Sequence, residues 1–310
     1  MVTVEDITWV RYRAPDLKLM AEFLADFGLH PVAATEDKLF MRAHGPMPVA
    51  HITERGPAGH IGFGLKARSR ADMEKLAAEF SAPIERRNEP GGGEVVTVTD
   101  PDGTRIEVVH GLGSHGALEA RAAFGFNPKH DRVRHNKTVR VKSAPSLVQR
   151  LGHVAIFTGR FDAMKSFYMD VLGMRVSDEY YVGDSNNVMA TFLHCGLDDE
   201  FVDHHTVALI GNGQTGFEHC AFEVSDLDDL MSGNAFLLSR NRWTHSWGIG
   251  RHVEGSQIFD YWRDPFGNKI EHWTDGDLVN DHYETGNQEF NPEKSLSQWG
   301  PSVTKDFLDP

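Results

Sequence analysis

The sequence predicts an α+β protein of two domains, each built from two βαβββ modules. The first observation is the length of 310 residues, about twice that of a typical single domain. The second is internal repetition, because three strand and helix patterns of the first half return in the same order in the second half. The third is an ordinary globular composition, with 40% hydrophobic and 25% charged residues, which excludes a disordered chain.

The first repeated pattern opens each half. Residues 7–29 read ITWVRYRAPDLKLMAEFLADFGL, and residues 151–174 read LGHVAIFTGRFDAMKSFYMDVLGM. In both, alternating apolar residues predict a strand, and apolar residues at helical spacing then predict an amphipathic helix. We expect the helices to end at Gly28 and Gly173, because a glycine just past a helix adopts the left-handed conformation without steric cost.

The other two patterns complete each half. The second consists of GHIGFGLKARSRADMEKLA (residues 59–77) and EHCAFEVSDLDDLMSG (residues 218–233), and each copy predicts a short strand, a polar turn and a helix. The third consists of VVTVTDPDGTRIEVVH (residues 95–110) and QIFDYWRDPFGNKIEHW (residues 257–273). Its DPxG sequence predicts a tight turn between two strands, since proline fixes φ and glycine accepts a left-handed turn position.

These repeats divide the chain into four segments. Residues 1–112 form a first domain, residues 113–148 a linker, residues 149–275 a second domain, and residues 276–310 a C-terminal tail or lid. The linker contains KHDRVRHNKTVRVK, in which six basic residues stand against one aspartate. We interpret this run as a solvated surface or a contact between domains, and not as a nucleic-acid-binding arm, because the whole chain is acidic.

Charge and composition exclude several classes of function. The chain carries 31 Lys+Arg and 45 Asp+Glu, a net charge of −14, which argues against nucleic acid or an anionic membrane as partner. No apolar run approaches the roughly 18 residues of a membrane span, and the N-terminus lacks a signal-peptide pattern. The two cysteines, Cys195 and Cys220, form no CxxC motif, so we expect a reducing cytoplasmic compartment.

Aligning the two halves brings out a candidate metal site in the second. Three residues of metal-binding type fall there on three separate strands: His153, His219 and Glu271. The matched residues of the first half are Trp9, His60 and Glu107, and Trp9 cannot bind a metal. A single strand histidine is usually a packed core residue, but three at matched positions are harder to dismiss. Two histidines and one carboxylate form the facial triad of non-haem Fe(II) oxygenases, which leaves open positions for substrate and O₂.

Three sequence motifs carry a resemblance to a known family. GRHVEGSQIFDYWRDPFGNKIEHW places a Tyr nine residues after Gly-Arg-His and a Glu ten residues later, at His252, Tyr261 and Glu271. HHTVA (residues 204–208) contains His205, and FLHC (residues 192–195) begins with Phe192. The chain resembles, over nearly its whole length, the type I extradiol ring-cleaving dioxygenases of the vicinal oxygen chelate superfamily.

The resemblance implies a fold, a reaction and a set of residue roles. Each half is expected to form incomplete mixed β-barrels, the vicinal oxygen chelate fold, with a degenerate first domain and a catalytic second one. The implied reaction is meta cleavage of a catechol-type ring with both atoms of O₂, in the degradation of aromatic compounds. The implied cofactor is Fe²⁺, or Mn²⁺ bound by the same ligands. The resemblance also implies a homo-oligomer, with a tetramer favoured. His205 is the implied acid–base residue, and His252 and Tyr261 would hydrogen-bond substrate oxygens.

Departures from the family pattern concern the substrate. Trp247 stands where the homoprotocatechuate branch has an Arg that holds a substrate carboxylate, and GLDDEFVD (residues 196–203) is longer than the same segment of the biphenyl-diol branch. Five residues at matched positions are expected to line the pocket: Ala155, Phe192, His245, Trp247 and Ile249. The mostly apolar set predicts a preference for neutral alkyl- or aryl-substituted catechols, because an unpaired carboxylate is costly to bury.

Two alternative functions stay open at this stage. One is an O₂-independent metalloenzyme of the same superfamily, such as a glyoxalase or epimerase, which uses Zn²⁺, Ni²⁺ or Mn²⁺. Such sites generally have four protein ligands, and only three align here. The other is a non-catalytic small-molecule-binding protein, which would need no metal triad.

Overall fold

The computed structural model describes residues 1–304 and 307, and its first half contains two βαβββ modules as predicted. The elements of the first module are β1 (Val4–Ala14), α1 (Leu17–Phe27), β2 (His30–Ala34), β3 (Lys38–Arg42) and β4 (His51–Arg55). Those of the second are β5 (Gly59–Ala67), α2 (Arg70–Phe80), β6 (Ile84–Arg86), β7 (Glu94–Thr99) and β8 (Arg105–His110).

The second half repeats this order and adds three strands, β12, β18 and β19. Its first module comprises β9 (Val148–Phe157), α3 (Phe161–Ser166) with a π-helical turn (Phe167–Val171), β10 (Met174–Tyr181), β11 (Val188–Cys195), the short β12 (Val202–Asp203) and β13 (Val207–Ile210). Its second comprises β14 (Gly216–Val224), α4 (Leu227–Ser239), β15 (Thr244–Arg251), a 3₁₀ turn (Glu254–Ser256), β16 (Ile258–Arg263) and β17 (Lys269–Thr274). The strands β18 (Leu278–Val279) and β19 (Gly286–Glu289) follow.

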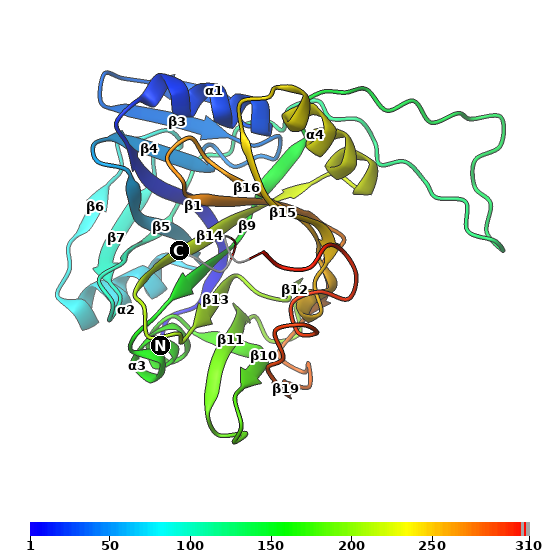
Figure 1. The fold of residues 1–310 in the computed structure, drawn as a ribbon. Helices are drawn as coiled ribbons and strands as arrows, with labels where there is room; N and C mark the ends of the chain where they lie inside the picture. Colours follow the sequence, from blue (N-terminus) through cyan, green and yellow to red (C-terminus); the bar gives the residue numbers. More distant parts are fainter. Residues whose placement is uncertain (305–306, 308–310) are drawn as a thin grey trace.

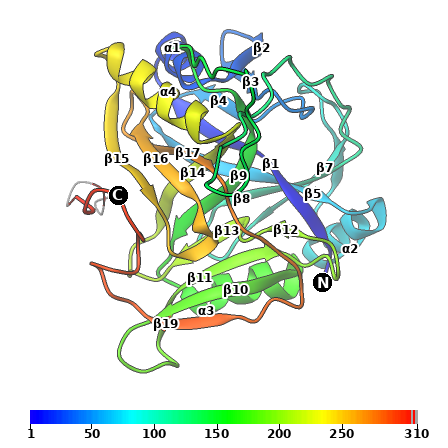
Figure 2. The same cartoon turned by 90° about the vertical axis from the view of Figure 1, so that its right-hand side faces the viewer.

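Apart from the short β12–β18 pair, each half folds into one curved mixed sheet (Figures 1 and 2). The strand orders are β2-β3-β4-β1-β5-β8-β7-β6 and β15-β16-β17-β14-β9-β13-β11-β10-β19. In both sheets the modules join through an antiparallel pair, β1 with β5 and β9 with β14, and parallel pairs flank this junction. The predicted α+β architecture of the vicinal oxygen chelate fold is confirmed.

Helix ends follow the local sequence. The carboxylate of Asp16 accepts hydrogen bonds from the first backbone amides of α1, and Gly28 ends that helix with φ +117°. Ser69 and Asp226 cap α2 and α4 in the same way, at equivalent positions of the two halves. Gly173 follows the π-helical turn with φ +72°, so both predicted helix-ending glycines adopt the left-handed conformation.

Side chains of the central strands β1, β5 and β14 form contacts between the two halves. The hydroxyl of Tyr12 on β1 lies 3.4 Å from Cys220 Sγ on β14. The ring of His60 stacks on that of Phe217, with centroids 3.6 Å apart and planes 14° apart. In the strand registers, His60 pairs with Tyr12 as Phe217 pairs with Ile156, so the stacked rings occupy the same position of the two halves.

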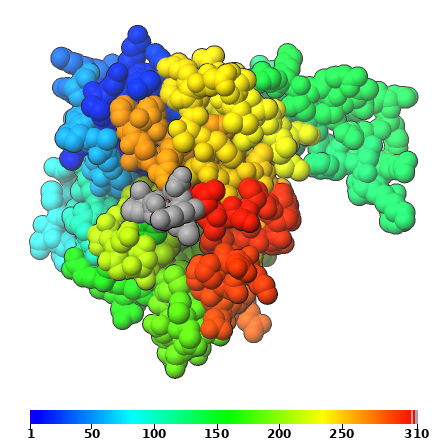
Figure 3. Space-filling model, viewed as in Figure 1, coloured from blue at the N-terminus to red at the C-terminus, as the bar shows by residue number. Residues whose placement is uncertain are grey.

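Two segments lie outside the repeated modules. Residues 111–147 contain no strand or helix and include an arm that leaves the body of the protein (Figures 1 and 3). The chain after β17 lies on the second half, where β19 pairs in parallel with β10. Among the described residues, the longest helix has 13 residues, and none is long and apolar enough to cross a membrane.

Candidate metal centre

Three donor atoms converge on adjacent strands of the second half. The Nε2 atoms of His153 on β9 and His219 on β14 are 3.2 Å apart, and both lie close to Glu271 Oε2 on β17, at 3.3 and 3.2 Å. Sheet order explains the convergence, because β17, β14 and β9 are neighbours. His153 and Glu271 both pair with Ala221, so their side chains share a face of the sheet.

The unsatisfied polar atoms of this cluster fit a divalent cation. Both carboxylate oxygens of Glu271 are buried without a hydrogen-bond donor, an arrangement that is costly unless a cation completes it. Burial by itself raises the pKa of Glu271, but the neighbouring His153 and His219 hold it well below its usual range. Two imidazole nitrogens and one carboxylate oxygen are ligands that Fe²⁺ and Mn²⁺ accept.

Glu218 and Lys269 support this cluster, and sequence reasoning missed both. Glu218 contacts Nδ1 of His219 through one oxygen and the buried ammonium of Lys269 through the other. Burial opposes a charge on His219, but Glu218 raises its pKa to about 9, and a bound metal would displace that proton. Adjacent strand residues normally point to opposite faces. A register shift between Phe217 and His219 lets Glu218 reach the cavity beside His219.

The matched cluster of the first half is satisfied by protein groups. Glu107 Oε2 accepts hydrogen bonds from Trp9 Nε1 at 2.9 Å and Arg11 Nε at 3.0 Å, and Arg105 binds Oε1 at 2.7 Å. The Arg11 guanidinium also binds Glu89 at 2.8 Å. Cationic and indole N–H groups therefore surround Glu107, whereas the oxygens of its counterpart have no donor.

The prediction that His60 occupies the position of His219 is wrong. Glu107 pairs with Gly64 as Glu271 pairs with Ala221, so Gly62, two residues earlier, is the counterpart of His219. A Cβ atom on Gly62 would lie 1.9 Å from the carbonyl oxygen of Arg105, so the backbone admits no side chain there. The first half therefore has no histidine at either position, since Trp9 and Gly62 stand there.

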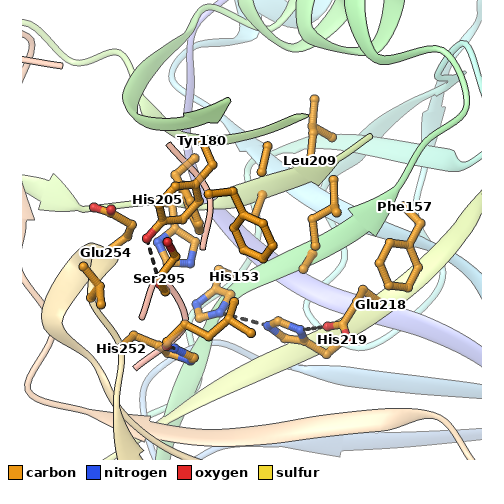
Figure 4. A pocket seen from close by; sticks show the side chains of 18 of the residues that line it. His153, Phe157, Tyr180, His205, Leu209, Glu218, His219, His252, Glu254 and Ser295 are labelled. Atoms are coloured by element: carbon orange, nitrogen blue, oxygen red, sulfur yellow. Dashed lines mark hydrogen bonds and ion pairs between the residues drawn. The ribbon is translucent and has the colours of Figure 1, made fainter. Parts of the chain in front are cut away.

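A cavity of about 350 Å³ opens beside the metal cluster (Figure 4). His153, His205 and His219 lie along one side of it, and Glu254 lies further along its wall. Most of the remaining wall is apolar, and includes Ala155, Phe157, Phe192, Trp247, Phe290 and Phe307. Three of the five residues predicted for the pocket, Ala155, Phe192 and Trp247, are among these. Phe290 and Phe307 come from the chain after β17.

The other two predicted pocket residues lie elsewhere. His245 pairs with Trp262 in the β15–β16 register, and its Nε2 lies 2.7 Å from Asp260 Oδ1. Ile249 packs against the main hydrophobic core. The cause is local, because β15 shifts register between His245 and Trp247 and again on either side of Ile249. A regular strand would have placed all three on one face.

The three predicted catalytic residues gather around the cluster. The His205 ring centroid lies 4.2 Å from that of His153. Tyr261 pairs directly with Glu271 across the β16–β17 hairpin, and its hydroxyl lies 2.9 Å from His252 Nε2. The other ring nitrogen of His252 donates to the carbonyl of Leu296 at 2.8 Å, so in the neutral ring Nε2 accepts from Tyr261.

Burial sets the protonation of two of these groups. It raises the pKa of the Tyr261 phenol well above its ordinary value. It also lowers the pKa of His205 well below that of a free imidazole, and the adjacent His153 acts in the same direction. In the metal-free protein, therefore, Tyr261 keeps its proton and His205 is neutral.

Comparison with known proteins places the chain in a family. The model of the Glyoxalase/Bleomycin resistance protein/Dioxygenase superfamily matches residues 150–272. "Metapyrocatechase 2" of Cupriavidus necator is 31% identical over 98% of this chain and 92% of its own length. This chain belongs to the extradiol dioxygenases of that superfamily.

A second relative and a solved structure resemble the chain over most of its length. "Iron-dependent extradiol dioxygenase" of Rhodococcus jostii (strain RHA1) is 24% identical over 90% of this chain and 92% of its own length. Among solved structures, the Mn(II)-bound glyoxalase from Novosphingobium aromaticivorans aligns with a TM-score of 0.82 and 24% identity. That alignment covers 100% of this chain and 96% of the glyoxalase, and it shows a shared fold.

Proposed function

We propose that this extradiol dioxygenase uses Fe²⁺, held by His153, His219 and Glu271, to cleave a neutral alkyl- or aryl-substituted catechol with both atoms of O₂. The observation that carries the proposal is the convergence of two imidazole nitrogens on the donor-less carboxylate of Glu271, beside an apolar cavity and next to His205. Iron is supported by the name of the Rhodococcus relative. Mn²⁺, which the same ligands accept, is the alternative metal.

The side chains of the cavity divide the work of the reaction. A divalent metal at the three ligands would bind the catechol oxygens and O₂, and its charge would lower the pKa of the ring hydroxyls. His205 accepts a proton from an incoming ring hydroxyl and returns it when the ring opens. The His252–Tyr261 pair lies beside the ligands, and opening its 2.9 Å bond would free the Tyr261 hydroxyl to donate to a substrate oxygen as negative charge develops there.

The charges around the cavity favour a neutral ring substituent. Trp247 lies in the wall at the position where an arginine would bind a carboxylate. The nearby Arg251 is already engaged, with one nitrogen on Ser256 O at 2.6 Å and another on Asp275 at 2.7 Å. Lys269 is neutralised by Glu218. An acidic substituent would therefore lose its hydration without gaining a cation.

A glyoxalase-like reaction without O₂ is the second candidate function. The shared fold of the Mn(II)-bound glyoxalase favours it. Among the described residues, however, the ligand group consists of three side chains, His153, His219 and Glu271, and not four. Three ligands on one face leave room for both a chelating catechol and O₂.

The segment boundaries, compartment and assembly belong to the same proposal. Residues 1–112 are the degenerate domain, 113–148 the linker, 149–275 the catalytic domain, and 276–310 a C-terminal tail or lid. Buried Cys195 and Cys220, which form no disulfide, support a reducing cytoplasm.

The basic linker supports a homo-oligomer. It carries seven basic and two acidic residues in a chain of net charge −14, so it can dock on the acidic surface of another copy. The family resemblance favours a tetramer.

Aerobic turnover of a reconstituted protein tests the reaction. Anaerobic, metal-free protein is loaded with Fe²⁺ or, in parallel, Mn²⁺, then mixed with 3-methylcatechol in air. The expected result is a yellow ring-opened product with one O₂ consumed per product. Failure of both metal forms to consume O₂ with any of a panel of alkyl, aryl and carboxylated catechols would overturn the proposal.

A further inference from the structure

A buried chain of polar groups lies behind the proposed acid–base residue. His204 Nδ1 is 3.1 Å from His205 Nδ1, and His204 Nε2 is 2.6 Å from Asp178 Oδ2. The exposed fractions of Asp178, His204 and His205 are 4%, 1% and 5%. Among the described residues, His204 is thus the side chain that links His205 to a carboxylate.

Residues that follow β17 pack against Asp178, the carboxylate end of this series of hydrogen bonds. Gly286 on β19 pairs with Asp178, and a Cβ atom at Gly286 would lie 2.0 Å from Asp178 Oδ1. The hydroxyl of Tyr283 donates to Asp178 Oδ2 at 3.3 Å. On the other side, Ser177 Oγ donates to the backbone carbonyl of His204 at 2.5 Å. These contacts hold Asp178 and the backbone of His204 in place, and the bonds at Nδ1 and Nε2 set the ring plane of His204.

Asp178 and His204 form a second cluster with Glu254, and this cluster differs from the candidate metal centre. Asp178, His204 and Glu254 offer ligand atoms within 4.8 Å of one another. Each of them, however, has protein partners: His204 binds Asp178, Asp178 also accepts from Tyr283, and Glu254 accepts from Gln288 at 3.4 Å. Burial and the neighbouring Asp178 also raise the pKa of Glu254 to about 7. Protein groups thus supply partners to all three side chains, whereas the oxygens of Glu271 have no donor.

The direction of each hydrogen bond follows from elementary valence rules. A carboxylate only accepts, so Nε2 of His204 carries the proton shared with Asp178. In a neutral His204 ring, Nδ1 is then an acceptor. Because His205 Nδ1 faces that acceptor, it must carry the proton of the His205 ring. The remaining nitrogen of His205, Nε2, is left with a free lone pair.

We propose that His204 is a positioning residue, which, backed by Asp178, holds the His205 proton on Nδ1 and so presents Nε2 as a base to the cavity. The inference rests on the proposed catechol chemistry for its purpose. In that chemistry the O–H bond of a ring hydroxyl breaks, a new N–H bond forms at His205 Nε2, and the electron pair stays on the catecholate oxygen. Asp178 and His204 thereby act on a substrate that they do not touch.

The tautomer of His205 is measurable without metal or substrate. Metal-free protein labelled with ¹⁵N at histidine is compared with a His205→Phe sample, which identifies the His205 signals in long-range ¹H–¹⁵N spectra. We expect a protonated Nδ1 and an unprotonated Nε2 on His205. In His204→Phe, which removes the acceptor, the His205 signals should shift towards the Nε2-protonated form. A wild-type spectrum with the proton on Nε2 would overturn the proposal.

Kinetics of Fe²⁺-loaded variants test the consequence for turnover. We expect His204→Phe to lower kcat about 10–100-fold, as loss of an orienting partner typically does, with unchanged KM for 3-methylcatechol and unchanged metal content. His204→Asn should recover most of the rate, because the asparagine oxygen can replace Nδ1 as acceptor. A His204→Phe enzyme with wild-type kcat would contradict the proposal.

Matched variants separate this role from simple stability. His194 is equally buried and shares Ser177 with the His204 backbone, through a 2.7 Å contact between Nδ1 and Oγ. His194→Phe should therefore affect stability without moving the His205 tautomer. If His204→Phe does not fold, Asp178→Asn and His204→Asn carry the test. If wild-type protein cleaves no catechol, the spectra still decide the tautomer, so the two proposals fail independently.

Discussion

Trp9 donates a hydrogen bond from its indole nitrogen to Glu107 at 2.9 Å, at the place where the second half brings His153 Nε2 to 3.3 Å from Glu271. The two carboxylates occupy the same position of the repeat but have opposite surroundings. Glu107 is saturated by N–H donors, and Glu271 has none. The second half thus keeps its carboxylate open to a cation, and the first half fills the equivalent place with indole and arginine N–H groups.

Glu271→Gln should abolish metal binding and turnover together. The amide is a weaker, neutral ligand, so Fe²⁺ content measured by elemental analysis should fall well below one per chain, while the circular dichroism spectrum is unchanged. Glu107→Gln is the matched control, because it alters the equivalent carboxylate, and it should leave metal content unchanged. A Glu271→Gln protein with wild-type iron and activity would remove the metal assignment.

The wild-type chain should bind one equivalent of iron. Gly62 leaves no room for a ligand and Trp9 supplies none, so the first half has no site to fill. Equilibrium dialysis against Fe²⁺ under anaerobic conditions measures the stoichiometry. Two tightly bound equivalents per chain would contradict the asymmetry.

His205→Phe should separate binding from chemistry. The variant keeps all three ligands, so we expect normal iron content and normal catechol binding. Loss of the acid–base group should slow ring cleavage about 10²–10⁴-fold. Single-turnover kinetics measure the cleavage step directly. Turnover within a few-fold of wild type would assign the acid–base role to another group, with His252 as the next candidate.

Neutral catechols should be better substrates than acidic ones. Each buried CH₂-sized group gains on the order of 0.8 kcal/mol in the apolar wall, whereas a carboxylate finds no free cation among the described charges of the cavity. We expect a higher kcat/KM for 3-methyl- or 4-methylcatechol than for homoprotocatechuate or protocatechuate. A clear preference for either acid in steady-state assays would exclude the apolar-pocket model.

Glu89→Gln should destabilise the metal-free protein at neutral pH and much less at acidic pH. Burial alone raises the pKa of Glu89, but hydrogen bonds from Arg11 and Lys38 outweigh it and lower the pKa to about 2. The ordinary glutamate pKa is higher, so this stabilisation is complete above pH ~4.5 and disappears as the pH falls towards 2. It corresponds to about 3 kcal/mol. Urea denaturation of both proteins at several pH values measures the difference, and a pH-independent difference would refute the linkage.

Sequence patterns predicted the module order and the ligand types, but not the register of every strand. His60 and His219 were matched by residue type, and a two-residue slip in a strand keeps the same face, so periodicity cannot detect it. The helix caps Ser69 and Asp226 hold the correct register, because each follows its strand at the same distance. The placement of His245 failed for a related reason, since β-bulges interrupt alternation without a sequence signature.

The cavity wall was the least predictable part. Phe290 and Phe307 reach it from a segment with little regular structure, where neither helical nor strand periodicity reports which side chains point inward. The Glu218–Lys269 pair was equally hidden, since a charged residue beside a ligand on a strand is expected to face away from it.

The stack of His60 on Phe217 reveals an approximate two-fold symmetry between the halves. His60 and Phe217 occupy the same position of the two halves and touch each other. Such a contact between equivalent residues occurs at the two-fold axis of a symmetric dimer. The two halves therefore meet as two copies of one subunit meet at the axis of a symmetric dimer. Because both halves lie on one polypeptide, each residue at the axis can change separately. One copy is then free to become a scaffold while the other retains its chemistry.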